Sequence, residues 1–184
     1  MIIGGKDLLN GKRFDKGGYI LTYDYDKWSF IDPKEAQKKL NLPRNPRDYT
    51  SIAVTTDDSN DEIVYASSMG DGVIQYKNGT PVQSYNEKNA FKETAGGYGS
   101  GYCYIDGLAF DKHGNLWMTS SEVNHAVLVL DKAGAWHRLD IEQLRGVYTI
   151  NDILITSTND KWIYVPRNTP KLVMIPNSES LDEV

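Results

Sequence analysis

The chain has 184 residues, which predicts a single domain, and its balance of 40% hydrophobic and 24% charged residues is that of an ordinary globular protein. A net charge of −5 argues against nucleic acid and anionic membranes as partners, and no apolar run approaches the roughly 18 residues that a membrane-spanning helix needs. One cysteine, Cys103, excludes an internal disulfide framework and a cysteine zinc site.

The first predicted element is a β-hairpin near the N-terminus. The segment GYILTYDYDKWSFI pairs the run from Tyr19 to Tyr23 with the run from Trp28 to Ile31. Asp24 and Asp26 lie in the turn between them, and turn chemistry explains both carboxylates without an acid–base role. The first residues, MIIGG, lack the basic and long apolar regions of a signal peptide. We therefore expect either a cytosolic protein or a fragment of an exported one that lacks its signal peptide.

A short helix should follow this hairpin. In the segment DPKEAQKKL, Asp32 is suited to the N-cap and Pro33 to the first helical position. The sequence therefore predicts a helix from Pro33 to about Leu40.

The next four strands form two hairpins. The segment SIAVTTDDSNDEIVYASS joins 52–54 to 63–66, and GVIQYKNGTPVQSY joins 73–76 to 82–85. The acidic run DDSNDE, residues 57–62, contains side chains that suit calcium. It lacks the spacing and the distal Glu of an EF-hand, so a solvated turn explains it.

A loop rich in glycine and tyrosine, NEKNAFKETAGGYGSGYCY, comes next. Residues 96–101 include four glycines, so we expect residues 87–104 to be mobile and sensitive to proteases. A phosphate-binding loop is disfavoured, because no strand precedes the glycines and no helix with Lys-Ser or Lys-Thr follows them. Tyr98, Tyr102 and Tyr104 instead form a candidate stacking surface for a sugar or a peptide.

The segment GLAFDKHGNLWMTSS predicts another hairpin over residues 107–121. Its turn, Asp111 to Asn115, contains an Asp, a His, a Gly and an Asn, which would also suit a metal or acid–base site. A turn explains them sufficiently, because Asp111 can accept backbone N–H groups and Gly114 or Asn115 can adopt a positive φ. The following segment, AVLVLDKAGAWHRL, adds a second hairpin and completes a unit of four strands.

The last strands repeat the pattern in INDILITSTNDKWIYVPRN. Trp117 and Trp162 are 162 − 117 = 45 residues apart, and Trp28, Val82 and Trp136 are spaced by 54 and 54 residues. A repeat of this length with four short strands in each unit is typical of β-propeller blades. We therefore expect both Trp117 and Trp162 to be buried structural residues.

The predicted fold class is all-β, a β-propeller fragment of about three to four four-stranded antiparallel blades. Residues 1–184 are predicted to be a single propeller segment, with a partial blade at 18–31, blades at 51–86 and 105–140, and a partial blade at 150–176. Roughly three and a half blades do not close the usual ring of four to eight. We expect either that a longer chain supplies the remaining blades, or that the chain forms a homodimer or higher oligomer through its two partial blades.

The blade sequences resemble the two-component regulator propellers of Bacteroidetes-type bacteria. The resemblance rests on YIDGLAFDKHGNLWMTSSEVNHAVLVLDKAGAWHRLD, on SIAVTTDDSNDEIVYASSMGDGVIQYKNGTPVQSYN and on YDKWSFID. Their order is most similar to that of the PorZ-like proteins of the type IX secretion system, over most of residues 18–165. The resemblance implies a periplasmic or cell-surface location, in a sensor domain or a surface protein, and a longer parent chain.

A second candidate ligand site lies at the beginnings of two inner strands. Asp106, Asn151 and Asp152 should face the central channel of a propeller, where they could bind a ligand. Calcium-dependent lactonases with six blades use channel-facing acids and amides of this kind, but the Glu that their pattern also needs is not found here. The alternative is that Asp106 and Asp152 hydrogen-bond to neighbouring loops.

No catalytic residue, resident metal or cofactor is predicted. His113, His125 and His137 are spaced by 12 and 12 residues, but they should lie at different ends and faces of a blade, which disfavours a zinc site. The chain has no Gly-x-Ser-x-Gly motif and no evident nucleophile–base pair.

The function we expect is recognition of a protein or glycan ligand, without catalysis, by an extracytoplasmic sensor or a secretion-associated protein. Two alternatives stay open. One is a calcium-dependent, lactonase-like hydrolase or lyase, and the other is a purely structural module of a larger surface assembly.

Overall fold

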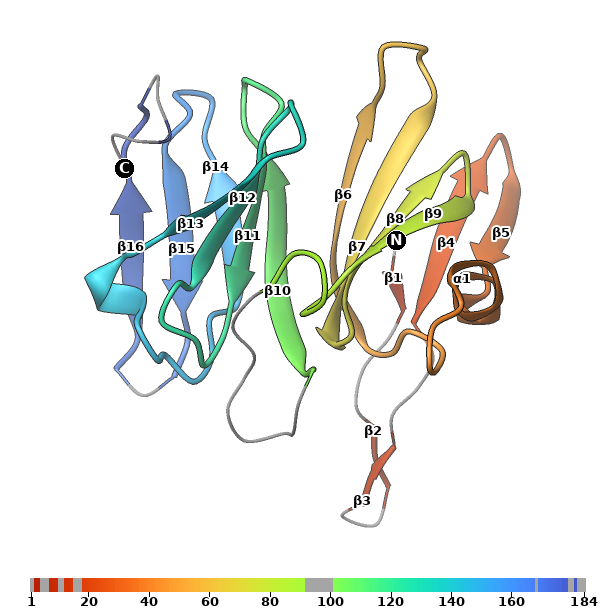
Figure 1. The fold of residues 1–184 in the computed structure, drawn as a ribbon, viewed down its shortest axis with the longest axis horizontal. Coiled ribbons are helices and arrows are strands. Elements are labelled where there is room, and N and C mark those ends of the chain that lie inside the picture. Colours follow the sequence, from red (N-terminus) through yellow and green to blue (C-terminus); the bar gives the residue numbers. More distant parts are fainter. Residues whose placement is uncertain are drawn as a thin grey trace.

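In the part of the chain that the structure describes, four blade-sized antiparallel sheets stand side by side in the order of the chain (Figure 1). The computed structural model describes residues 2–3, 7–9, 12–14, 18–91, 101–167, 169–178 and 181. The first strand of the third sheet lies against the first strands of the second and fourth sheets. This is the arrangement of propeller blades around a channel, so the predicted all-β propeller fold is confirmed.

The two middle sheets are meanders of four strands. The second sheet contains β6 (Tyr49–Thr56), β7 (Glu62–Gly70), β8 (Gly72–Lys77) and β9 (Thr80–Tyr85). The third sheet contains β10 (Cys103–Phe110), β11 (Leu116–Ser120), β12 (Val127–Leu130) and β13 (Trp136–Leu139). The start of β10 also pairs with the end of β7, Cys103 with Gly70 and Tyr104 with Met69, which links the two sheets.

The first and last sheets have three strands each. The first contains β1 (Ile2–Ile3), β4 (Tyr19–Asp24) and β5 (Lys27–Ile31), and the last contains β14 (Asp152–Ile155), β15 (Lys161–Val165) and β16 (Lys171–Ile175). A separate hairpin pairs β2 (Asp7–Leu9) with β3 (Lys12–Phe14). The sequence predicted only β4 and β5 in the first sheet. The strand β1 was missed because two residues are too few to show a pattern.

The predicted helix is confirmed. The helix α1 spans Pro33–Leu40, and the Asp32 carboxylate accepts a hydrogen bond from the backbone N–H of Lys34 at 2.9 Å. Asn41 ends the helix in the left-handed conformation, with φ of 52°. A single 3-10 turn, η1 (Glu142–Leu144), follows the third sheet. Neither of these described helices is both long and apolar enough to cross a membrane.

The DKHGN segment is a turn, as predicted. Asp111 Oδ1 accepts the backbone N–H groups of His113 and Asn115, each at 2.9 Å, and Gly114 has φ of 85°. The other carboxylate oxygen, Oδ2, accepts the indole N–H of Trp117 at 2.9 Å. Burial opposes ionisation of Asp111, but the hydrogen bonds from Trp117 and Asn115 outweigh it and lower the pKa of this carboxyl. One carboxylate therefore shapes the turn and anchors the buried tryptophan.

Three apolar clusters fill the spaces between successive sheets. Between the first and second sheets lie Ile20, Val64, Ala66, Ile74 and Tyr76. Between the second and third sheets lie Val73, Ile105, Leu108, Leu116, Met118 and Leu128. Between the third and last sheets lie Trp117, Val127, Val129, Ile153, Ile163 and Val165. Neighbours such as Trp117 and Met118 fall in different clusters because successive side chains on a strand point to opposite faces. Each middle sheet therefore packs against a neighbouring sheet on both of its faces.

Two buried serines, 121 − 67 = 54 residues apart, tie successive sheets together at the inner strands. Ser67 Oγ donates to the backbone carbonyl of Asp106 at 3.1 Å and accepts the N–H of Ser51 at 3.0 Å. Ser121 Oγ donates to Asp106 Oδ2 at 2.7 Å and accepts the N–H of Ile150 at 2.9 Å. The same repeat position thus bridges to the next sheet in both cases.

The predicted burial is confirmed for Trp117, which is 0% exposed, and is wrong for Trp162, which is 38% exposed. Both lie at the same place in their hairpins, since Trp117 pairs with Ala109 and Trp162 with Leu154. The last sheet covers Trp117, but among the described residues no further sheet covers Trp162. The preceding residue, Lys161, faces inward instead, with Nζ 4.5 Å from the centroid of a Trp117 ring. Burial lowers the pKa of Lys161.

Replacement of Trp117 should separate its packing from its hydrogen bond. Trp117→Ala should destabilise the chain by about 3–5 kcal/mol, because it leaves a large cavity between two sheets. Trp117→Phe should cost less, about 1–3 kcal/mol, mainly because Asp111 Oδ2 loses a donor. Thermal unfolding followed by circular dichroism measures both, with about 2–4 °C of Tm expected for each kcal/mol. An unchanged Tm for Trp117→Ala would contradict the packing described.

Candidate functional site

A small cavity of about 160 Å³ opens where β7 turns into β8, and this rim cavity is the candidate binding site. One wall comes from residues 42–46, which connect α1 to β6, and another comes from Gly70 and Asp71 in the turn. Ser84 in β9, residues 86–88 after that strand, and Gly101 complete it. The cavity is thus lined mainly by connections between strands. Such connections can change in sequence without disturbing the strands of a propeller.

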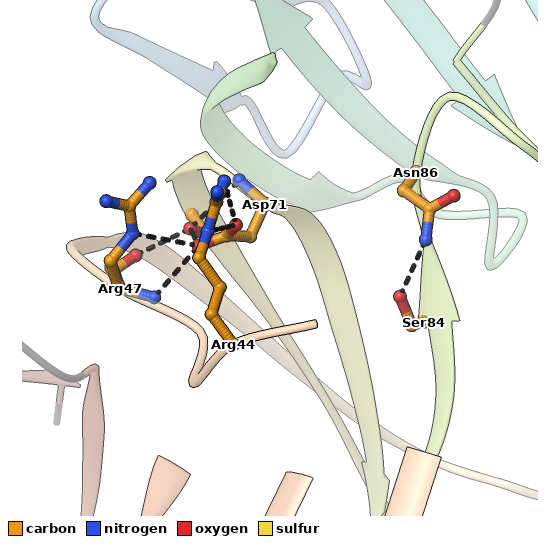
Figure 2. A network of polar contacts seen from close by, with 6 residues as sticks. Arg44, Arg47, Asp71, Ser84 and Asn86 are labelled. Atoms are coloured by element: carbon orange, nitrogen blue, oxygen red, sulfur yellow. Dashed lines mark hydrogen bonds and ion pairs between the residues drawn. The ribbon is translucent and has the colours of Figure 1, made fainter. Parts of the chain in front are cut away.

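The centre of this site is Asp71, which two arginines clamp (Figure 2). Asp71 Oδ1 lies 2.7 Å from Arg44 Nε and 2.6 Å from Arg44 Nη2. Asp71 Oδ2 accepts the backbone N–H of Arg47 at 3.2 Å and lies 3.5 Å from Arg47 Nε. The carboxylate side chain is only 14% exposed, whereas that of Arg44 is 48% exposed. The largely buried Asp71 carboxylate therefore positions the Arg44 guanidinium, which still faces solvent. The N–H groups of a guanidinium suit carboxylates and other acceptors.

The opposite wall carries amide and hydroxyl groups (Figure 2). Asn86 Nδ2 donates to Ser84 Oγ at 3.1 Å, and Asn86 Oδ1 accepts the backbone N–H of Lys88 at 3.0 Å. Glu87 and Lys88 add one charge of each sign to the lining. The cavity therefore presents hydrogen-bond donors, hydrogen-bond acceptors and charges of both signs. This set suits the hydroxyl, amide or charged groups of a sugar or peptide.

One of the predicted tyrosines, Tyr102, packs against Gly70 in the wall of this cavity. Gly70 has φ of 119°, and a Cβ added there would meet Tyr102 Cε2 at 2.6 Å, so only glycine allows this close approach. The Tyr102 ring contacts the Tyr104 ring edge to face, with centroids 6.4 Å apart. Tyr98 lies outside the described residues. Tyr102 therefore lies next to the cavity wall and Tyr104 contacts it, whereas their role in ligand stacking stays a prediction.

Asp106 lies elsewhere, buried on an inner strand. Its carboxyl is 6% exposed, and burial, with a smaller effect of the charge on Asp152, raises the pKa of Asp106 to about 8. The hydrogen bond from Ser121 acts in the opposite direction but is outweighed. The next residue, Gly107, lets β10 approach β14 closely, since a Cβ there would lie 2.6 Å from the Ile153 nitrogen. Asp106 is thus mostly protonated at neutral pH.

Asn151 and Asp152 are exposed at the start of β14. The Asn151 backbone N–H donates to the carbonyl of Tyr164 at 2.9 Å, and Asp152 Oδ1 accepts its neighbour's N–H, that of Ile153, at 2.8 Å. The structure brings Asp152 within electrostatic reach of Asp106. None of these three residues lines the rim cavity. The tyrosines and the acids are therefore separate groups.

Sequence reasoning missed Arg44, Arg47 and Asp71. The segment LPRNPRDY places both arginines in a proline-rich connection after the helix, which gave no chemical pattern. Their partner, Asp71, is 71 − 44 = 27 and 71 − 47 = 24 residues further along. Only the fold of the second sheet brings the three together, so no local spacing could have indicated the site.

The described cysteine and one described histidine are held within the fold. Cys103 is buried, and this burial raises the pKa of its thiol to about 12, so the reactive thiolate is not accessible at neutral pH. His137 Nε2 lies 2.9 Å from Asp131 Oδ2 within its own hairpin. Across residues 18–91 and 101–167, and the other described positions, no three His, Cys, Asp or Glu side chains gather as a metal site would require.

The fold is similar to that of a solved bacterial surface protein. PorZ, an essential surface component of the type IX secretion system of Porphyromonas gingivalis, matches 85% of this chain with a TM-score of 0.75 and 21% sequence identity. The chain spans only 21% of the length of that PorZ chain. At 21% sequence identity the match shows a shared fold, so the predicted resemblance is confirmed for the fold.

Two further solved structures match less well. The extracellular domain assigned to a hybrid two-component system of B. thetaiotaomicron matches 73% of this chain and 16% of its own, with a TM-score of 0.47 and 18% identity. The extracellular domain assigned to a one-component system of the same organism matches 73% of this chain and 19% of its own, with a TM-score of 0.48 and 15% identity. No protein-family model matches the sequence, and a search of curated proteins found no match.

The buried Asp106 should make stability depend on pH. Its pKa is about 8 in the folded chain and about 3.9 in an unfolded one. Its stabilising contribution is therefore full below about pH 4 and is lost as the pH rises to about 8. Asp106→Asn keeps an acceptor for Ser121 without the cost of ionisation, so its Tm should exceed that of the unmodified chain at pH 9 but not at pH 4.

In a matched variant, Asp140→Asn, the change in stability with pH should have the opposite direction. The hydrogen bond and charge of Arg145 lower the pKa of Asp140, so this variant should lose stability above pH 4 and not below it. Thermal unfolding at pH 4, 6 and 9 compares the three chains. Parallel curves for Asp106→Asn and the unmodified chain would contradict the raised pKa.

Proposed function

We propose that residues 1–184 form a single β-propeller segment that recognises a ligand without transforming it. The observation that carries this proposal is the rim cavity, in which Asp71 holds Arg44 toward solvent. The strands supply a rigid scaffold, and the connections that line the cavity supply the chemistry. The protonated Asp106 and the buried Cys103 are, by contrast, poorly suited to act as a general base or a nucleophile at neutral pH.

The proposed context is an extracytoplasmic sensor or a secretion-associated protein, in the periplasm or at the cell surface. The support is the fold shared with PorZ, which is itself a bacterial surface component of the type IX secretion system. The chain corresponds to about a fifth of that protein, so the remaining blades of a longer chain are proposed as its neighbours.

The proposed ligand is a glycan or a protein segment that places one polar group in the cavity. A volume of about 160 Å³ suits a sugar unit or a single side chain and not a whole cofactor. The Arg44 guanidinium would bind an acceptor of that group, and Asn86 and Glu87 would bind donors or acceptors on the other side. Tyr102, beside the cavity, would extend the contact surface.

Two alternatives remain as competing functions. A calcium-dependent, lactonase-like hydrolase or lyase would use Asp106 and Asp152, but calcium prefers ionised carboxylates, and burial keeps Asp106 protonated to about pH 8. A purely structural module would leave the rim cavity without a ligand.

Ligand binding at the cavity is tested by NMR titration with two probe sets, disaccharides and tetrapeptides. At least one probe should shift the backbone amide signals of Asp71, Asn86 and Gly101. Arg44→Ala should weaken that binding by about tenfold or more, because a charge-assisted hydrogen bond contributes roughly 1.5–3 kcal/mol.

The matched control is Arg145→Ala. Arg145 also forms a bidentate pair with an aspartate, Asp140, at 2.6 Å, but it does not line the cavity. Binding should survive in this variant. No shifts with either probe set would favour the structural module, and shifts unaffected by Arg44→Ala would place the ligand elsewhere.

Calorimetric titration with calcium at pH 7 separates recognition from the lactonase-like alternative. The recognition proposal expects no tight binding, because Asp106 is protonated and buried. Tight calcium binding that Asp152→Asn abolishes would favour the enzyme.

A further inference from the structure

A groove of about 570 Å³ lies between the second and third sheets, separate from the rim cavity. It opens between the turn that joins β6 to β7 and the turn that joins β10 to β11, at the end of the sheets opposite the β7–β8 turn (Figure 1). Its lining includes the half-buried rings of Tyr65 and Phe110, with centroids 5.9 Å apart. Its volume is that of a ligand pocket, for which roughly 300–1,000 Å³ is usual. We refer to it as the inter-sheet groove.

Three inner turns of the chain, which begin at Asp57, Asp111 and Thr156, share one backbone geometry. In each turn the N–H of the first residue donates to the carbonyl of the fifth, and the N–H of the fourth donates to the carbonyl of the first, at 2.9 or 3.0 Å. The fourth residue has a positive φ in all three turns. It is an asparagine in the first and last turns, whereas the middle turn has Gly114, which is equivalent to Asn159.

This one difference decides whether the space beside the turn is filled. Between the third and last sheets, Asn159 is 1% exposed, and its Oδ1 accepts the backbone N–H of Lys112 at 3.0 Å. Between the second and third sheets, Gly114 has no side chain to offer, and the equivalent N–H is that of Asp58. Among the residues that the structure describes, none accepts the Asp58 N–H. The inter-sheet groove therefore contains a backbone donor whose counterpart at the next interface is satisfied by an amide oxygen.

The side chains around this donor favour an acceptor as its partner. Lys112, His113 and Lys132 line the groove from the third sheet. On the facing wall, the Asp57 carboxylate is already paired with Lys77, with Oδ2 and Nζ 2.7 Å apart. An amide or carboxylate oxygen on a short stem complements a backbone N–H beside cationic side chains.

We propose that the inter-sheet groove binds a segment of another protein that inserts an asparagine or aspartate side chain. The inserted oxygen accepts the Asp58 N–H, as Asn159 Oδ1 accepts that of Lys112 within the chain. The occupant is a peptide because a peptide side chain of this kind fills the equivalent space at the next interface. The rings of Tyr65 and Phe110 contact the apolar residues beside the inserted one. The groove shares no lining residue with the rim cavity, so this site stands or fails independently of the proposed function.

The first test is an NMR titration with three peptides, acetyl-Leu-Asn-Leu-amide, acetyl-Leu-Asp-Leu-amide and acetyl-Leu-Ala-Leu-amide. The Asn or Asp peptide should shift the backbone amide signals of Asp58 and Gly114 but not that of Asp71. The Ala peptide should bind about two- to tenfold more weakly, because it lacks the accepting oxygen. An absence of shifts with all three peptides, or equal binding of all three, would overturn the proposal.

The second test fills the groove from within the chain. Gly114→Asn should place a side chain where the peptide binds and should abolish the shifts at Asp58. The turn accepts this change, because Asn159 has the same conformation and a Cβ at Gly114 would have Lys132 Cδ as its nearest neighbour, at an ordinary 3.6 Å. Gly134→Asn is the matched control: Gly134 also has a positive φ, of 91°, but it does not line the groove. Peptide binding that survives Gly114→Asn would contradict the proposed site.

The third test removes only the backbone donor. Asp58→Pro deletes the N–H, and proline is favoured at the second position of a β-turn. Asp58→Ala is its control, since it also removes the carboxylate but keeps the N–H. Asp58→Pro should bind the Asn peptide about two- to tenfold more weakly than Asp58→Ala does. Circular dichroism verifies that both variants are folded, and equal affinities for the two would show that the Asp58 N–H is not part of a binding site.

Discussion

Packing on both faces of the two middle sheets is the constraint on which the rest of this structure depends. A strand places successive side chains on opposite faces, and in β11 both sets are apolar, with Leu116 and Met118 facing the second sheet and Trp117 facing the last. Such a sheet is stable only between two others. The chain therefore stacks its sheets in sequence order, and each sheet packs apolar side chains against its neighbours.

Polar groups near the inner strands also link successive sheets. The hydroxyls of Ser67 and Ser121 satisfy backbone groups of the next sheet that the strand ladders leave unpaired. Asp106 takes part in the same arrangement and is protonated because it is buried there. Asp106, which the sequence suggested as a ligand-binding residue, is thus a buried partner of Ser121 in the contact between sheets.

The rim cavity follows from the same architecture. Most side chains of strands that are packed on both faces point into the apolar clusters, so the rim cavity is lined mainly by the connections between strands. Asp71, Arg44 and Arg47 belong to two such connections, and their ion pairs fix the geometry of a site that the sheets alone do not determine. Charges at this rim can change without disturbance of the apolar clusters.

The sequence by itself determined the elements and their repeat. Alternation predicted the strands, Asp32 and Pro33 predicted the start of α1, and Asp111 predicted a turn, because each depends on residues close in the chain. Only the tertiary structure decided the fate of equivalent residues: Trp117 is buried and Trp162 exposed, because burial depends on whether another sheet lies opposite. The tertiary structure also forms the rim cavity, since Asp71 contacts Arg44 only because the pairing of β6 with β7 brings these distant residues together. Local pattern specifies what a segment can form, whereas the partners of its side chains are set by contacts distant in the sequence.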